Sequence, residues 1–189
     1  MLIKLAVLFS GSGTNLENIL KKLHNKSFGE NHFEVSLCIC NKKNAYGIKR
    51  AEKYNIKTIL IEHEKYSTRE EFDKALVEQI QKHNINLTIL AGFMRILTPI
   101  FTKNIKAINL HPSLLPLFKG ANAIKQSYKS NMKVAGVSVH WVNEELDGGK
   151  IIAQKAFEKG NLSYEEFENT IHALEYEILP QTIIDIFKE

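Results

Sequence analysis

The sequence predicts an α/β protein with a doubly wound, mostly parallel sheet and helices on both faces. Apolar runs rich in Ile, Val and Leu recur over the first 110 residues without clean polar alternation, as in strands that are covered on both faces. Amphipathic segments of helical period separate these runs. In such a sheet, ligands bind at the carboxyl ends of the strands.

Five strands and three intervening helices are expected in the first part of the chain. The strands are Leu2 to Phe9, Phe33 to Cys40, Lys57 to Ile61, Asn86 to Ala91 and Ile105 to Leu110, and the helices are Asn15 to His24, Ala45 to Tyr54 and Thr68 to His83. The third helix opens with Thr68-Arg69-Glu70-Glu71, the pattern of a capping box.

A second set of elements follows residue 110. We expect a proline-bearing loop (His111 to Gly120), a helix (Ala121 to Ser130), two strands (Val134 to Val142 and Lys150 to Phe157) and, between these strands, a long loop from Asn143 to Gly149. A second capping box at Ser163 opens a long C-terminal helix, which Pro180 should kink or divide. We interpret residues 1–189 as one domain with two lobes, 1–100 and 101–189.

Composition and charge exclude several classes of protein. The 189 residues are 44% hydrophobic and 24% charged, as in an ordinary globular protein. No apolar run approaches the roughly 20 residues of a membrane span, and no export signal is visible, so we expect a cytoplasmic protein with no membrane partner. Cys38 and Cys40 are too few for a zinc site or a disulfide scaffold, and no metal is expected.

The net charge of +4 is unevenly distributed along the chain. Residues 144–189 hold eleven acids against four lysines, which leaves the first 143 residues with 21 basic and 10 acidic side chains. A basic first part favours anionic ligands. These ligands could be nucleic acid or small phosphorylated or carboxylated molecules; because the basic residues are scattered and no aromatic-interleaved stripe emerges, solvated helix faces are the favoured explanation.

A glycine-rich segment, Ser10-Gly11-Ser12-Gly13-Thr14-Asn15, stands between the first strand and the first helix. Glycines let the backbone approach an anion, and the helix N-terminus offers unpaired N–H groups. A dinucleotide site is disfavoured, because Leu16 replaces the third glycine and Asn41-Lys42-Lys43 replaces the ribose-binding acid. A monophosphate cradle and a simple tight turn remain as interpretations.

Asn109 and His111 end the fifth strand, and their spacing of two places both side chains on one side of the strand. An amide beside an imidazole can stabilise an oxyanion and move a proton. Asp147, on the Gly-flanked segment Glu144-Glu145-Leu146-Asp147-Gly148-Gly149, can approach the histidine and favour its protonated form, although an acidic turn is an equal interpretation. The apolar segment Ala91 to Leu97 suits a flat heteroaromatic ligand, or else packs as core.

Taken together, these motifs closely resemble the phosphoribosylglycinamide formyltransferases, also called glycinamide ribonucleotide transformylases, in their folate-dependent bacterial form. The resemblance rests on Gly-Ser-Gly-Thr-Asn, Ala-Gly-Phe-Met-Arg-Ile-Leu, Asn-Leu-His-Pro-Ser-Leu-Leu-Pro and Glu-Leu-Asp-Gly-Gly, which occur in the right order along the whole chain. It implies a Rossmann-like formyltransferase fold and 10-formyltetrahydrofolate as co-substrate.

The resemblance also implies a set of site residues. It implies that Asn109, His111 and Asp147 are catalytic, that Gly13, Thr14, Asn15 and Glu175 bind the ribonucleotide, and that Arg69, Met94, Arg95, Ile96, Leu97, Asn109, Asn143, Glu144, Glu145, Leu146 and Asp147 line the folate site. Two segments depart from the family pattern: Tyr176 stands where a histidine usually follows the glutamate, and the loop 117–122 differs.

The implied reaction transfers the formyl group of 10-formyltetrahydrofolate to the amine of glycinamide ribonucleotide in purine biosynthesis, by direct amine attack. Alternatives are a 10-formyltetrahydrofolate deformylase, a methionyl-tRNA formyltransferase and a non-catalytic nucleotide-binding module. The first two resemble longer chains with an additional domain, and the third leaves the Asn-His-Asp set unexplained. The sequence allows a monomer or a homodimer.

Overall fold

The computed structural model describes residues 1–188, which form two compact units. Unit 1 comprises Met1–Ile108 together with Lys188, and unit 2 comprises Asn109–Phe187. Strand β6 (Ala107–His111) begins in unit 1 and ends in unit 2.

The strands of unit 1 follow the order β2-β3-β1-β5, and β6 comes next to β5. Their bounds are β1 (Leu2–Phe9), β2 (Lys26–Phe28), β3 (Asn31–Cys40), β4 (Thr58–Leu60) and β5 (Leu87–Leu90). Strand β1 pairs in parallel with β3 and β5, and β4 pairs in parallel with β3, which confirms the predicted mostly parallel sheet. The short antiparallel β2, missed from the sequence, pairs with the start of β3.

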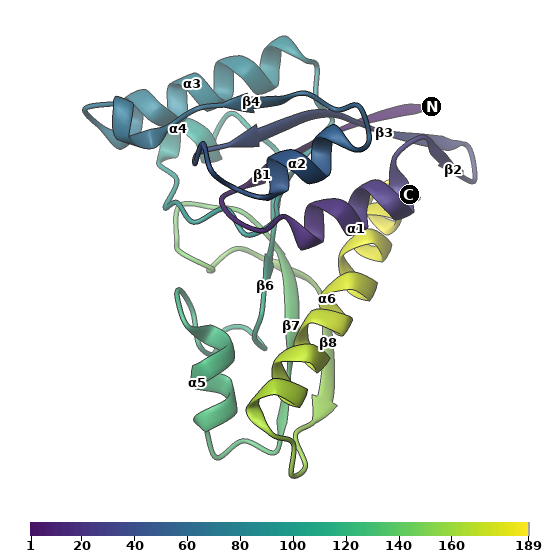
Figure 1. The fold of residues 1–189 in the computed structure, drawn as a ribbon, viewed down its shortest axis with the longest axis vertical. Coiled ribbons are helices and arrows are strands. Elements are labelled where there is room, and N and C mark those ends of the chain that lie inside the picture. Colours follow the sequence, from purple (N-terminus) through teal and green to yellow (C-terminus); the bar gives the residue numbers. More distant parts are fainter. Residues whose placement is uncertain (189) are drawn as a thin grey trace. The chain divides into compact units, whose positions relative to one another are not determined.

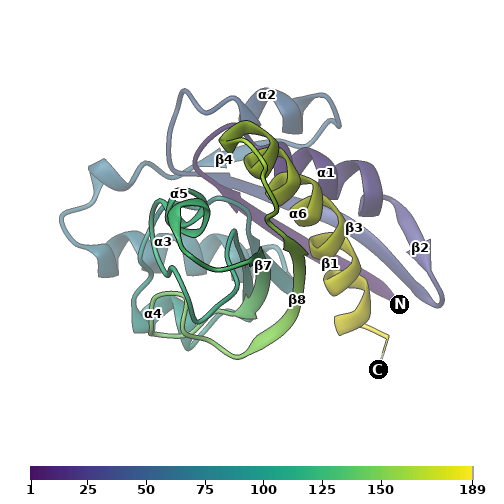
Figure 2. The same cartoon turned by 90° about the horizontal axis from the view of Figure 1, so that it is seen from below.

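Helices cover both faces of the unit 1 sheet. They are α1 (Thr14–Leu23), α2 (Gly47–Glu52), α3 (Arg69–Lys82) and α4 (Pro99–Thr102), with a 3₁₀ turn η1 at His63–Lys65. Figures 1 and 2 show α1 and α2 on one face and α3 with α4 on the other. This is the doubly wound arrangement that the alternation of strands and helices predicts.

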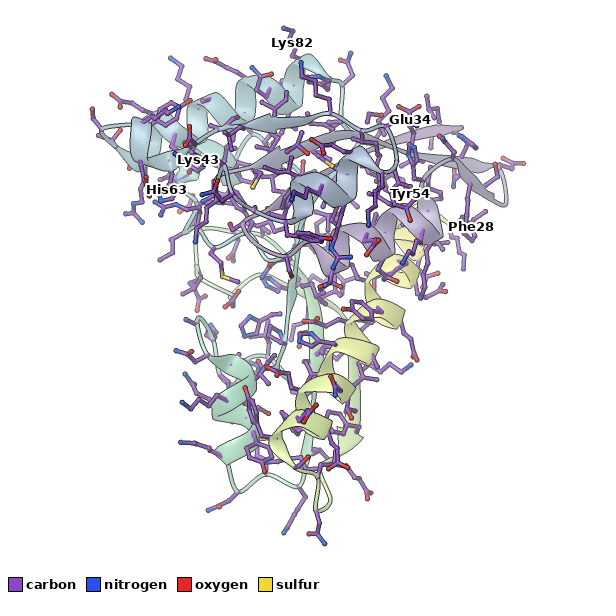
Figure 3. The ribbon with its side chains drawn as sticks, viewed as in Figure 1. Phe28, Glu34, Lys43, Tyr54, His63 and Lys82 are labelled. Atoms are coloured by element: carbon purple, nitrogen blue, oxygen red, sulfur yellow. The ribbon has the colours of Figure 1, made fainter. Side chains whose placement is uncertain are left out.

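The two ends of the unit 1 sheet differ in what they carry. Figure 3 shows Lys43 and His63, which follow the carboxyl ends of β3 and β4, at one end, and Glu34 and Tyr54 at the other. The predicted ligand-binding segments of unit 1 also follow strand carboxyl ends: Ser10 follows β1 and Ala91 follows β5.

Unit 2 is an antiparallel strand pair covered by a long helix. Its elements are β7 (Val134–Trp141), β8 (Ile151–Glu158), α5 (Ala123–Lys129) and α6 (Tyr164–Ile186). Strands β7 and β8 pair antiparallel, with a register shift between Val139 and His140. Helix α6 packs on both strands and on α5.

Two predictions about helix ends and breaks need correction. Helix α6 is continuous from Tyr164 to Ile186, so the expected division at Pro180 is wrong; the buried apolar residues of the helix and its packing on β7 and β8 compensate for the missing N–H. Ser163 and Glu166 form the predicted capping box. At α3, however, Thr68 accepts from the Glu71 N–H, while the Glu71 carboxylate accepts from Ser67 N–H, one residue earlier than in a capping box.

Candidate active site

Asp147 is the centre of a polar cluster in unit 2 that brings the three predicted catalytic residues together. One carboxylate oxygen accepts from the Asn109 side-chain amide at 3.1 Å. The other accepts from the Gly120 backbone N–H at 2.8 Å and lies 3.3 Å from His111 Nδ1. The Asp147 side chain is only 7% exposed, so these contacts are largely shielded from water.

Both ring nitrogens of His111 face oxygen atoms of the protein. Its Nε2–H donates to the Phe118 carbonyl at 2.8 Å, while Nδ1 faces the Asp147 carboxylate at 3.3 Å. The ring is buried, with 5% of the residue exposed, so the Asp147 carboxylate is the group that would compensate a positive charge on it.

The pKa of Asp147 lies below the ordinary value of 3.8 for aspartate. Burial alone would raise this pKa, but His140, the Gly120 N–H and the charge on His111 outweigh that effect. The residue also has a φ of 48°, a left-handed conformation that is uncommon for a residue with a side chain. The ionised carboxylate is thus held in a specific backbone geometry next to the histidine.

His140 belongs to the same cluster and was missed from the sequence. It lies in β7, is 2% exposed, and its Nε2 lies 3.1 Å from the Asn109 amide nitrogen and 3.6 Å from an Asp147 carboxylate oxygen. Its Nδ1–H donates to the Trp141 carbonyl at 2.9 Å. The signal for it was a polar pair, Ser138 and His140, at spacing two within an apolar strand.

The loop that carries Asp147 is shaped by glycine and lies mostly exposed. At Gly149 an added Cβ would lie 1.6 Å from the Trp141 carbonyl oxygen, so no other residue fits this backbone path. The predicted folate-lining residues of this loop are exposed: Asn143, Glu144, Glu145 and Leu146. Glu145 pairs with Lys119 at 2.6 Å, which ties the loop to the segment after Pro116.

The phosphate loop, defined as Ser10–Asn15, is packed tightly within unit 1. Gly13 has a φ of +72°, and an added Cβ there would lie 2.5 Å from the Gly47 Cα at the start of α2. Arg50 donates from Nε to the Ser12 carbonyl at 2.9 Å and forms an ion pair with Glu17 in the first turn of α1. The loop therefore presents the N-terminus of α1 in a fixed shape.

The apolar loop, defined as Gly92–Leu97, also lies in unit 1. Met94 and Ile96 are 70% and 51% exposed, whereas Leu97 is buried. The Arg95 guanidinium lies 5.9 Å from the centre of the Phe72 ring. Arg69 is the exposed first residue of α3. Two exposed apolar side chains and a cation therefore occur together in this loop, as a flat anionic ligand requires.

Glu175 is a buried carboxylate that pairs with a histidine of its own helix. It lies in α6, is 5% exposed, and pairs with His172 at 2.9 Å, one turn earlier. The hydrogen bond that His172 donates to the Glu175 carboxylate raises the pKa of His172 above its ordinary value, against the effect of burial. The His172 and Tyr176 rings stack at 6.5 Å, so Tyr176 supports the pair at the position where the family pattern has a histidine.

Within residues 1–188 no three His, Cys, Asp or Glu side chains are grouped so as to hold a metal ion. Over the same residues no helix has the length and apolarity to cross a bilayer.

Comparison with known proteins agrees with this fold. The formyl transferase family model matches residues 3–183. Phosphoribosylglycinamide formyltransferase of Bacillus subtilis is 39% identical over 95% of this chain and 92% of its own, and that of Haemophilus influenzae is 38% identical over 95% and 85%. The crystal structure of phosphoribosylglycinamide formyltransferase from Campylobacter jejuni is 71% identical, with a TM-score of 0.98 over 100% of this chain and 99% of that one.

The chain therefore belongs to the formyl transferase family, and within it to the phosphoribosylglycinamide formyltransferases.

Proposed function

We propose that this chain transfers the formyl group of 10-formyltetrahydrofolate to the primary amine of N1-(5-phosphoribosyl)glycinamide, a step of purine biosynthesis. The observation that carries the proposal is that one buried carboxylate, Asp147, contacts both the Asn109 amide and the His111 ring. The activity named for the full-length relatives supports it. The family match spans both units, which supports their acting as a single formyltransferase domain.

Asn109 and His111 supply hydrogen bonds to the formyl oxygen as it gains negative charge. The folate donor supplies a formyl carbon bonded to nitrogen; the substrate amine forms the new C–N bond, the old C–N bond breaks, and the amine proton passes to the folate nitrogen. Asp147 keeps His111 cationic during this step. Removing one such donor typically costs roughly 2.7–4 kcal/mol of barrier.

Both donors are engaged by protein acceptors in the resting enzyme. Asn109 donates to His140 and Asp147, and His111 donates to the Phe118 carbonyl. The formyl oxygen would replace one acceptor of each group, with the donors already desolvated and oriented. Direct attack by the substrate amine requires no enzyme nucleophile. The nearby Ser113 hydroxyl has a structural role instead, since it donates to the Leu117 carbonyl at 2.6 Å.

Unit 1 offers the anion-binding end of its sheet to the ribonucleotide phosphate. We assign the phosphate to Gly13, Thr14 and Asn15, at the N-terminus of α1, where N–H groups and the helix dipole favour an anion. The opposite end is disfavoured, because α1, α2 and α3 are each followed there by an asparagine of positive φ that ends the helix (Asn25, Asn55 and Asn84). A cavity of about 690 Å³ at that end contains none of the predicted site residues.

We assign two folate-binding segments, the apolar loop within unit 1 and, within unit 2, the loop of Asp147. Met94 and Ile96 expose apolar surface for a flat ring, and Arg69 and Arg95 supply cations for the glutamate tail. Glu175, already paired with His172, would bind the glycinamide end. We propose a cytoplasmic enzyme, monomeric or homodimeric, that acts on these small molecules and on no nucleic acid.

Product analysis by mass spectrometry tests the proposal. The purified protein is incubated with 10-formyltetrahydrofolate in the presence and absence of glycinamide ribonucleotide. Formyl-glycinamide ribonucleotide that forms only when the acceptor is present is the expected result. Free formate released without the acceptor would instead indicate a deformylase, and the absence of both products would contradict the proposal.

A further inference from the structure

Ser10 joins the phosphate loop to the apolar loop through two hydrogen bonds within unit 1. It directly follows β1, is 4% exposed, and lies opposite the chain that leaves β5. Its backbone N–H donates to the Gly92 carbonyl at 3.1 Å, and its hydroxyl oxygen accepts from the Met94 N–H at 2.8 Å. The first bond continues the pairing of the two strands, whereas the second exists only because residue 10 has a hydroxyl.

The side-chain bond fixes the part of the apolar loop that is exposed for binding. Gly92 has a φ of +73°, so the chain turns sharply there, and Met94 follows with its side chain 70% exposed. The Ser10 hydroxyl holds the backbone from which Met94 projects. Without it the Met94 N–H loses its acceptor at a partly buried position, where water replaces that acceptor only in part.

The phosphate loop offers little freedom to absorb a movement of Ser10. Gly13 is in close contact with Gly47, and the Ser12 carbonyl is held by Arg50. A displacement of the Met94 backbone is therefore transmitted to Ser10 and on to the following residues of the phosphate loop. A displacement of the phosphate loop is likewise transmitted through Ser10 to Met94.

We propose that Ser10 is a positioning residue that couples the binding of the two substrates. This inference rests on the proposed function, in which the phosphate loop holds the ribonucleotide and the apolar loop holds the folate. Each ligand orders the loop that it contacts, and because Ser10 belongs to one loop and is bonded to the other, the first ligand lowers the entropy cost of binding the second. Binding of either substrate strengthens binding of the other by the same factor.

Calorimetric titration with tetrahydrofolate, which lacks the formyl group and cannot react, measures this coupling. The Kd of tetrahydrofolate is determined with and without saturating glycinamide ribonucleotide. In the unmodified enzyme the ribonucleotide should lower that Kd at least ~5-fold, the lower end of typical couplings. In Ser10→Ala the factor should fall below about two. Ser36→Ala, which removes a hydroxyl bonded only to Glu34 on β3, should keep the full factor.

Retention of the full coupling factor in Ser10→Ala would overturn the inference, and so would the absence of coupling in the unmodified enzyme. If Ser10→Ala does not fold, Ser10→Cys replaces the oxygen by a sulfur of weak acceptor strength at similar size and should show the same loss. Failure of the unmodified enzyme to bind either ligand would instead overturn the proposed function itself.

Discussion

Replacement of Arg50 by glutamine should loosen the phosphate loop without touching the catalytic cluster. Arg50 Nε donates to the Ser12 carbonyl at 2.9 Å, and its guanidinium pairs with Glu17. The two side chains are 21% and 16% exposed, so water replaces the lost contacts only in part. A hydrogen bond to a charged group contributes about 1.5–3 kcal/mol, and an exposed ion pair adds only about 0.2–1 kcal/mol.

We therefore expect Arg50→Gln to lower the free energy of unfolding by about 2 kcal/mol, which for a chain of this size lowers Tm by roughly 4–8 °C. Because the lost bond holds the Ser12 backbone, the KM for glycinamide ribonucleotide should rise about tenfold, the equivalent of 1.4 kcal/mol. The KM for 10-formyltetrahydrofolate should change less. Thermal unfolding and steady-state kinetics with each substrate varied measure these effects.

Lys49→Gln is the matched control for Arg50→Gln, since Lys49 is the exposed cation next to Arg50. This substitution should leave both Tm and the KM for glycinamide ribonucleotide unchanged. A double-mutant cycle with Glu17→Gln separates the ion pair from the bond to Ser12: the double variant should lose little more than Arg50→Gln alone. An Arg50→Gln enzyme with unchanged Tm and unchanged KM for the ribonucleotide would refute this account of the phosphate loop.

Two further predictions concern stability. Asp73 in α3 is fully buried and accepts the Thr98 N–H at the end of the apolar loop. Burial raises its pKa above 3.8, so its stabilising contribution is present at low pH and is lost as pH rises through the raised pKa. In urea denaturation, Asp73→Asn should therefore gain stability relative to the unmodified enzyme between pH 4 and pH 7. A stability difference that stays constant over this pH range would contradict the argument. Lys159 Nζ donates to three backbone carbonyls around the end of α5 at 2.8–2.9 Å, so Lys159→Met should cost about 2–4 kcal/mol in the same assay, whereas Lys133→Met should cost little.

Local signals in the sequence were sufficient for much of the fold and of the candidate site. Apolar runs and helical spacing identified the main strands and helices, because burial on both faces of a parallel sheet leaves a continuous apolar pattern. Asn109 and His111 could be paired because spacing in a strand fixes the face on which side chains lie. Asp147 follows His111 by 36 residues in the sequence, yet the structure brings the two side chains together. The only sign of this contact in the sequence was an acidic residue flanked by glycines.

Features that depend on contacts distant in sequence could not be predicted. His140 lies in an apolar strand, and its contacts with Asn109 and Asp147 reveal that it belongs to the cluster. The bond between Ser10 and Met94 joins residues 84 positions apart. Pro180 was expected to disturb α6, but tertiary packing of the helix outweighs the local penalty. The β2 strand is short and exposed, so it carries no apolar pattern of its own.

The central claim is that Asn109, His111 and Asp147 together transfer the formyl group. The most direct test is the rate of formyl-glycinamide ribonucleotide formation, followed by mass spectrometry, in Asn109→Ala, His111→Ala and Asp147→Asn. Each variant should lose about 10²–10³-fold in kcat, the effect of removing one oxyanion donor or the charge that maintains it. Turnover near that of the unmodified enzyme in all three variants would contradict the claim.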